Sequence, residues 1–189
     1  MSSKKWPQIA GIFGILSPVV TISLVLLAIA LSPWFSWSAN ALSDLGVGEA
    51  ALIFNSGLAI GAVSTMLFSS GIFLSSKKRA VRRHGSIVLF AAAVSLLGVG
   101  IFTEAAGGAH FYFSVAFFFL LCFSLFILGA GHILAGSRMF GAFTISAGAM
   151  AAIPWAFSWT ALAVPETISA LAAGVWSILQ GTRLYMGKV

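Results

Sequence analysis

Four polar side chains carry most of the chemistry that this sequence offers: Asp44, Asn55, Glu104 and His110. Three of them fall in or beside connections between apolar runs, and Asn55 lies just inside the second run. Carboxylate, amide and imidazole groups together can hold a polar head group, a small solute or a cation. We therefore predict that these four residues line one shallow, outward-facing polar cup and bind a ligand there.

Several polar residues of the connections also have a purely structural interpretation. Glu49 and Glu166 stand near the beginning of predicted helices, where a carboxylate complements the helix dipole, and this interpretation is preferred for both. His110 could serve only to hydrogen-bond the glycine-rich turn before it. Asn55 could link two helices through its amide.

The spacing of the histidines does not predict a metal site. His110 and His132 are 22 residues apart on one predicted helix, which is ~33 Å at 1.5 Å per residue. A catalytic zinc usually takes two or three imidazole or thiolate ligands, so only an oxygen-rich calcium or magnesium site remains open. No HExxH, P-loop, GxSxG or CxxC motif occurs. We predict no catalytic residue and no cofactor.

The composition of the chain indicates that most of its residues lie in lipid and not in water. The chain has 189 residues, of which 60% are hydrophobic and 7% charged, whereas a soluble domain is about 25% charged. The net charge of +6 does not indicate nucleic-acid binding, because the basic residues lie only in short connections between apolar runs. They are expected to contact lipid head groups and to orient the protein.

The apolar runs predict six transmembrane helices, at about residues 8–32, 50–75, 85–103, 110–135, 139–163 and 167–185. All ten Lys and Arg residues fall at the two chain ends, between the second and third spans, or between the fourth and fifth. All four acidic residues fall in the alternate connections. This segregation predicts a multi-pass protein of the cell membrane with both termini in the cytoplasm.

The predicted fold is therefore an all-α integral membrane protein, a single six-helix bundle over residues 1–189, with membrane lipids as partners. Pro154 is expected to bend the fifth span. Gly57 and Gly61 form a GxxxG pair, which permits close helix packing within the bundle or a homo-oligomer seam.

Short motifs in the loops resemble a known family. LSDLG at 42–46, FNSGL at 54–58 and GIFTE at 100–104, followed by His110, are similar to the pattern of the prokaryotic family called domain of unknown function 998. The family often has a proline where this chain has Thr103. The resemblance implies a six-helix membrane protein with no assigned activity. A more distant similarity is to the Frag/DRAM/Sfk group, which is linked to membrane lipid organisation.

Three functions follow from these observations. The preferred one is a non-enzymatic membrane protein that binds a lipid head group, a small solute or a cation in the outer cup. The second is a small channel or proton-coupled transporter, in which Glu104 and His110 would titrate. The third and least favoured is a metal-dependent membrane lipid hydrolase, because Ser43, Asp44 and His110 lack further histidines on the same side.

Overall fold

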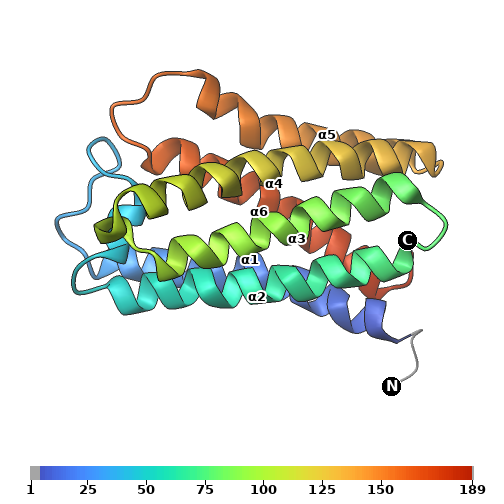
Figure 1. Ribbon diagram of the computed structural model, residues 1–189, viewed down its shortest axis with the longest axis horizontal. Helices are drawn as coiled ribbons and strands as arrows, with labels where there is room; N and C mark the ends of the chain where they lie inside the picture. Colours follow the sequence, from blue (N-terminus) through green and yellow to red (C-terminus); the bar gives the residue numbers. More distant parts are fainter. Residues whose placement is uncertain (1–4, 189) are drawn as a thin grey trace.

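The computed structural model describes residues 5–188, and they form helices joined by short connections, without a strand (Figure 1). The long helices are α1 (Trp6–Ala30), α2 (Ala51–Ser75), α3 (Ala80–Ile101), α4 (Gly108–Leu134), α5 (Arg138–Ala152) and α6 (Ala163–Tyr185). Three short 3₁₀ helices, η1 (Leu42–Gly46), η2 (Glu104–Ala106) and η3 (Ile153–Ala156), lie in the connections. The predicted all-helical fold is confirmed.

The fifth and sixth helices differ from the predicted ranges. Helix α5 ends at Ala152 and passes into η3, which contains Pro154, instead of continuing to residue 163. Proline lacks an N–H and its ring crowds the preceding turn, so the α-helix cannot pass through it unchanged. Helix α6 begins at Ala163, earlier than predicted, with Pro165 in its first turn, where a missing N–H costs nothing.

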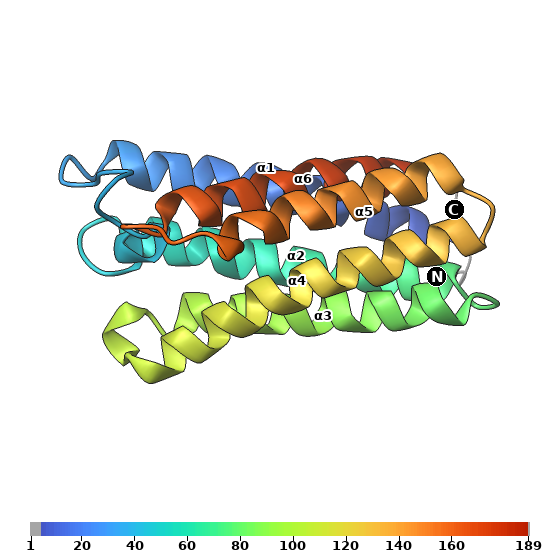
Figure 2. The same cartoon turned by 90° about the horizontal axis from the view of Figure 1, so that it is seen from above.

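The six long helices form a ring in chain order. Each packs against the next, and α6 packs against α1 to close the ring. Figures 1 and 2 show that α1 begins and α6 ends at the same end of the bundle. That end also carries the α2–α3 and α4–α5 connections and is called here the basic end. The opposite end holds η1, η2 and all four acidic residues, and is called the acidic end.

Large apolar side chains cover much of the outer surface of the bundle. Leu52, Phe119 and Met139 are 80%, 67% and 89% exposed. Within residues 5–188, five segments are long and apolar enough to cross a membrane, namely α1 to α4 and α5 together with η3. A surface of this kind is stable in lipid and unfavourable in water. The chain is therefore a multi-pass membrane protein.

The two glycines of the GxxxG pair contact α1 of the same chain. A Cβ atom on Gly57 would lie 2.9 Å from Cβ of Leu24. Thr21 donates a hydrogen bond to the Gly57 carbonyl (3.2 Å), and Ser17 donates one to the Gly61 carbonyl (2.9 Å). Both glycines thus serve close packing of α1 on α2, and the homo-oligomer through them stays a prediction.

Another serine compensates for the proline inside α1. Pro18 has no N–H for the carbonyl of Gly14, four residues earlier. The hydroxyl of Ser177 on α6 donates to that carbonyl at 2.7 Å. The vacated acceptor therefore becomes a link between α1 and α6, which closes the helix ring.

We predict that Ser177→Ala lowers the free energy of unfolding by about 1 kcal/mol, because the Gly14 carbonyl loses its remaining donor. In a Pro18→Ala background, the restored backbone N–H should supply that donor, and Ser177→Ala should cost much less. Unfolding in mixed micelles with increasing SDS measures both values. An equal loss in the two backgrounds would contradict this account.

Candidate ligand-binding site

The connection between α1 and α2 folds into a structured cap at the acidic end. The backbone N–H of Ser36 donates to Oδ1 of Asn40 (3.0 Å), and Nδ2 of Asn40 donates to Oδ2 of Asp44 (2.8 Å). The N–H of Ala41 donates to the same Asp44 oxygen (3.0 Å). Asp44 is half-buried in this arrangement, and its carboxylate fixes the start of η1.

Two of the predicted site residues, Asp44 and Glu104, meet between η1 and η2. Their carboxyl groups lie within hydrogen-bonding reach of each other, and the hydroxyl of Ser43 donates to Oε1 of Glu104 at 3.4 Å. Although Glu104 is exposed, its carboxyl group lies next to Ser43 and Asp44 of η1. Two carboxyl groups within hydrogen-bonding reach of each other repel when both are ionised, so binding of one proton between them is favoured.

The two carboxyl groups respond in opposite directions. Burial of its carboxyl group, the hydrogen bond with Asp44 and the charge of Asp44 raise the pKa of Glu104 to about 7. Burial also pushes the pKa of Asp44 upward, but hydrogen bonds from Glu104, Asn40 and the Ala41 N–H outweigh it and leave that pKa below its usual value. When the pair holds one proton, these opposite directions favour its location on Glu104, whose carboxyl group would then donate to the Asp44 carboxylate.

Asn55 supports the same cap from α2. Its Nδ2 donates to the carbonyl of Gly46 at 3.0 Å. A Cβ atom on Gly46 would lie 2.9 Å from Oδ1 of Asn55, so a larger residue at position 46 would displace the Asn55 amide from this contact. The structure thus gives Asn55 a positioning contact with the segment that carries Asp44.

His110 makes a separate pair of contacts in the turn between α3 and α4. Its Nδ1 lies 2.8 Å from the carbonyl oxygen of Phe102, and its Nε2 lies 3.3 Å from the hydroxyl of Ser114. Nδ1–H donating to Phe102 and Nε2 accepting from Ser114 satisfies both groups. The ring is buried. The structure therefore brings Asp44 and Glu104 together, attaches Asn55 to their cap, and leaves His110 occupied with its own turn.

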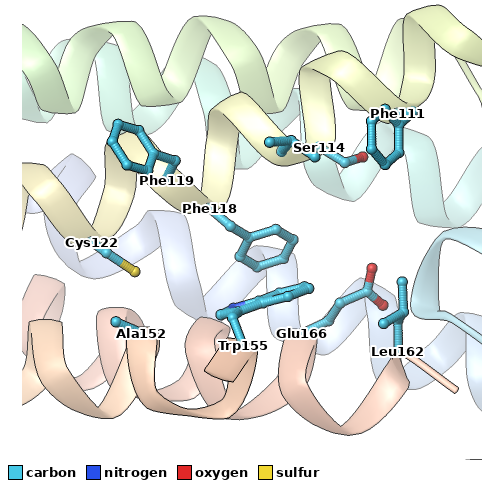
Figure 3. A pocket seen from close by; sticks show the side chains of 10 residues that line it. Phe111, Ser114, Phe118, Phe119, Cys122, Ala152, Trp155, Leu162 and Glu166 are labelled. Atoms are coloured by element: carbon cyan, nitrogen blue, oxygen red, sulfur yellow. The ribbon is translucent and has the colours of Figure 1, made fainter. Parts of the chain in front are cut away.

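Glu166, which the sequence favoured as a helix-end acid, lies inside the protein. It is 8% exposed, and its Oε2 accepts a hydrogen bond from the backbone N–H of Leu42 at 2.6 Å. Its other carboxylate oxygen has no hydrogen-bond partner within residues 5–188. Figure 3 shows the carboxylate directed into a cavity beside Leu162 and below Phe118. A glutamate in the first turn of a helix has the same sequence pattern whether it faces solvent or the interior, so the sequence did not indicate that Glu166 is buried.

Two apolar cavities meet at Glu166. The central cavity, of about 370 Å³, lies between α1, α2, α3, α4, α6 and η1, and its lining includes Leu42, Ser43 and Phe54. The side cavity, of about 400 Å³, lies between α4, η3 and α6, and its lining includes Trp155 and Cys122. Ser114, Phe118 and Glu166 line both cavities.

The walls of these cavities are almost entirely hydrophobic, with a few polar groups near the acidic end. Trp155 stacks at a tilt on Phe118, with ring centroids 4.5 Å apart, and its indole N–H donates to Ser169 at 2.9 Å. Among residues 5–188, no group of three or more His, Cys, Asp or Glu side chains is arranged to hold a metal ion. The chemistry available is hydrogen bonding and charge at one end of an apolar space.

A ring of apolar helices with its charges confined to the two ends defines a polytopic membrane protein. Residues 15–183 match the model of the family described as "Protein of unknown function (DUF998)", and the chain belongs to this family. The predicted resemblance is confirmed. No curated protein and no solved structure matches the chain.

We predict that Glu104→Gln reduces the pH dependence of stability between about pH 4.5 and 7. Because the folded-state pKa of Glu104 lies above its ordinary value of 4.5, folding takes up a proton in this range. The stabilisation is complete below the ordinary pKa and is lost as the pH rises through about 7. Thermal unfolding from pH 4 to 8 measures the effect.

Asp44→Asn should move the protonated-carboxyl infrared signal of Glu104 to lower pH, because it removes the neighbouring negative charge. Glu49→Gln, which removes the same charge from an exposed acid at the same end, serves as the control. A wild-type pH profile that Glu104→Gln leaves unaltered would contradict the shared-proton pair.

Proposed function

We propose that this protein binds one positively charged amphiphile, with its apolar chain in the central cavity and its ammonium group against Glu166. The observation that carries the proposal is the placement of Glu166, a buried carboxylate with one free oxygen, where two apolar cavities meet. Binding is proposed as the function, without a chemical step.

The size and lining of the central cavity support an amphiphile. Ligand pockets are typically about 300–1,000 Å³, mostly apolar, with a few polar groups that fix orientation. The central cavity has that volume and offers the polar groups of Ser43, Ser114 and Glu166. A small polar solute or a bare cation would leave most of the apolar wall without a partner.

The charge at the acidic end supports a cationic head group. The four acidic residues lie there, and an ionised carboxylate only accepts hydrogen bonds. Glu166 lies close enough to Asp44 and Glu104 for their charges to interact. An ammonium group would supply both the donors and the opposite charge, whereas a phosphate or carboxylate head group would be repelled.

We further infer that all six long helices cross the membrane and that the basic end faces the cytoplasm. Helix α6 is less apolar than the others, but three of its polar residues, Glu166, Ser169 and Gln180, are buried inside the bundle. Its 23 residues span ~34 Å at 1.5 Å per residue, enough for a hydrocarbon core of about 30 Å. The excess of Lys and Arg at one end supports its cytoplasmic orientation.

Proton-coupled transport is a second candidate, favoured by the proton that Asp44 and Glu104 share. Against it, Phe68 and Trp176 fill the interior toward the basic end, with ring centroids 5.9 Å apart and both side chains fully buried. A hydrated path would have to displace them. Proton flux into liposomes containing the protein tests this candidate directly.

The amphiphile proposal predicts that a long-chain alkylamine binds to the purified protein and that Glu166→Gln weakens its binding about ten- to a hundredfold, the value of one hydrogen bond to a charged group. Native mass spectrometry after gentle extraction measures retention. Glu49→Gln removes the same charge from an exposed site and should bind like wild type.

An alcohol of the same chain length should bind more weakly than the amine, and an alkyl sulfate more weakly still. Equal retention of the three probes, or of the amine by wild type and Glu166→Gln, would contradict the proposed head-group site.

For the topology, we predict that Glu49→Cys reacts with a membrane-impermeant maleimide on intact spheroplasts, in a Cys122→Ser background. Lys5→Cys and Lys188→Cys should react only after lysis, because an even number of spans puts both on the inner side. Labelling of Lys188→Cys alone from outside would mean that one helix does not cross.

A further inference from the structure

A second polar cluster is buried at the basic end, remote from the proposed amphiphile site. Arg82, near the start of α3, is 1% exposed, and its Nε and Nη2 atoms have no hydrogen-bond partner in residues 5–188. The opposing residue on α4 is Gly131, where a Cβ atom would lie 3.0 Å from the Arg82 backbone nitrogen. The backbone of α4 thus approaches closely and encloses the arginine side chain.

Other buried polar groups without a well-formed hydrogen bond lie near Arg82. Gln180 on α6 is 1% exposed and lies within hydrogen-bonding reach of His132 on α4, which is 2% exposed. Within residues 5–188, neither polar atom of the Gln180 amide nor Nε2 of His132 makes a hydrogen bond of good geometry. Nε of Arg183, on α6, is also buried without a partner. The charges of Arg82 and Arg183 lie close enough to each other and to His132 to interact. Three helices therefore direct hydrogen-bonding groups into one region.

Within the described chain, no acidic side chain compensates this cluster. All four acidic residues of the sequence are at the acidic end, opposite to the end that carries this cluster. A buried guanidinium without an opposite charge or hydrogen-bond acceptors is strongly unfavourable. The orientation of the protein does not require it either, because exposed basic residues such as Lys77, Lys78 and Arg83 provide the same charge at no such cost.

Aromatic contacts hold the cluster in place but leave its hydrogen-bond donors unused. The Arg183 guanidinium stacks 4.3 Å from the centre of the Phe140 ring, and His132 meets the same ring edge-on at 4.9 Å. A cation on an aromatic face keeps its N–H groups available at its edges. The cluster therefore holds its guanidinium donors in place for an anionic acceptor, which no residue among 5–188 supplies at this end.

We propose that this cluster binds a phosphate-type oxyanion at the basic end of the bundle. Arg82 and Arg183 would neutralise its charge, and Gln180 and His132 would donate further hydrogen bonds to its oxygens. Arginine forks match the geometry of phosphate oxygens. Inorganic phosphate and the phosphate of a lipid head group share this chemistry, and the inference does not depend on the amphiphile site.

The first experiment compares the thermal unfolding of the full-length protein, in an uncharged detergent, in sodium phosphate and in sodium chloride of equal ionic strength. The variants are Arg82→Met, which keeps an unbranched apolar stem and removes the charged guanidinium, and Arg83→Met. Arg83 is the matched control, because it is adjacent, exposed and stacked on Phe73 at 4.3 Å.

Wild type and Arg83→Met should unfold at higher temperature in phosphate than in chloride, and Arg82→Met should not. The phosphate affinity of Arg82→Met should fall about ten- to a hundredfold, corresponding to one lost charge-assisted hydrogen bond. Arg82→Met also removes an unpaired buried charge, so it should fold at least as well as wild type without phosphate. Gln180→Leu retains the full charge and should also weaken the phosphate response.

The second experiment identifies the source of the anion. The same proteins are placed in nanodiscs of phosphatidylcholine alone or with phosphatidic acid. A phosphate response that is lost in Arg82→Met and Gln180→Leu supports a site for the free anion, and stabilisation by phosphatidic acid alone, lost in the same variants, supports a lipid head group. Equal responses of wild type and Arg82→Met to both probes, or no response of wild type to either, would overturn the proposal.

Discussion

In an apolar solvent, a polar group is stable only when it finds a partner within the bundle or lies at one of the two ends. Many features of this protein follow from that constraint. The hydroxyls of Ser17, Thr21 and Ser177 donate to backbone carbonyls of neighbouring helices, and these links help close the ring. The acceptor that Pro18 leaves open is used in the same way. The helices are thus joined by polar contacts as well as by apolar packing.

The same constraint applies to buried polar groups whose hydrogen-bonding atoms are only partly paired. Glu166 has one carboxylate oxygen bonded to the Leu42 N–H and the other facing an apolar cavity. Arg82 has two buried nitrogens without a partner. The first group needs a donor and the second needs an acceptor, and they lie at opposite ends of the bundle. A protein that meets a cationic amphiphile on one side and an oxyanion on the other would use both.

The candidate site also shows how a loop becomes part of a binding surface. The connection between α1 and α2 is fixed by Asn40, Asp44 and Asn55, each through a hydrogen bond to a group no more than nine residues away. Glu104 meets this cap from another connection. The raised pKa of Glu104 beside Asp44 predicts that the cap responds to pH near neutrality, next to Ser43, which lines the central cavity.

The sequence by itself determined the all-helical fold, the membrane environment, the family and the separation of basic from acidic residues. These properties depend on the length and composition of apolar runs and on short loop motifs, which can be recognised along the chain. It also placed Asp44 and Glu104 on one side, because charge segregation fixes which connections share an end. The end of α5 could not be predicted in the same way, because a proline can either bend a helix or end it. In this protein, Pro154 ends it.

Only the tertiary structure decided which polar residues face the interior and what they meet there. Glu166 and Glu49 look alike in sequence, as do Arg82 and Arg83, yet in each pair one is buried and the other exposed. The difference arises from the rotation of each helix against its neighbours and from close approaches such as that at Gly131. Those contacts join residues far apart in the chain, and no local pattern records them.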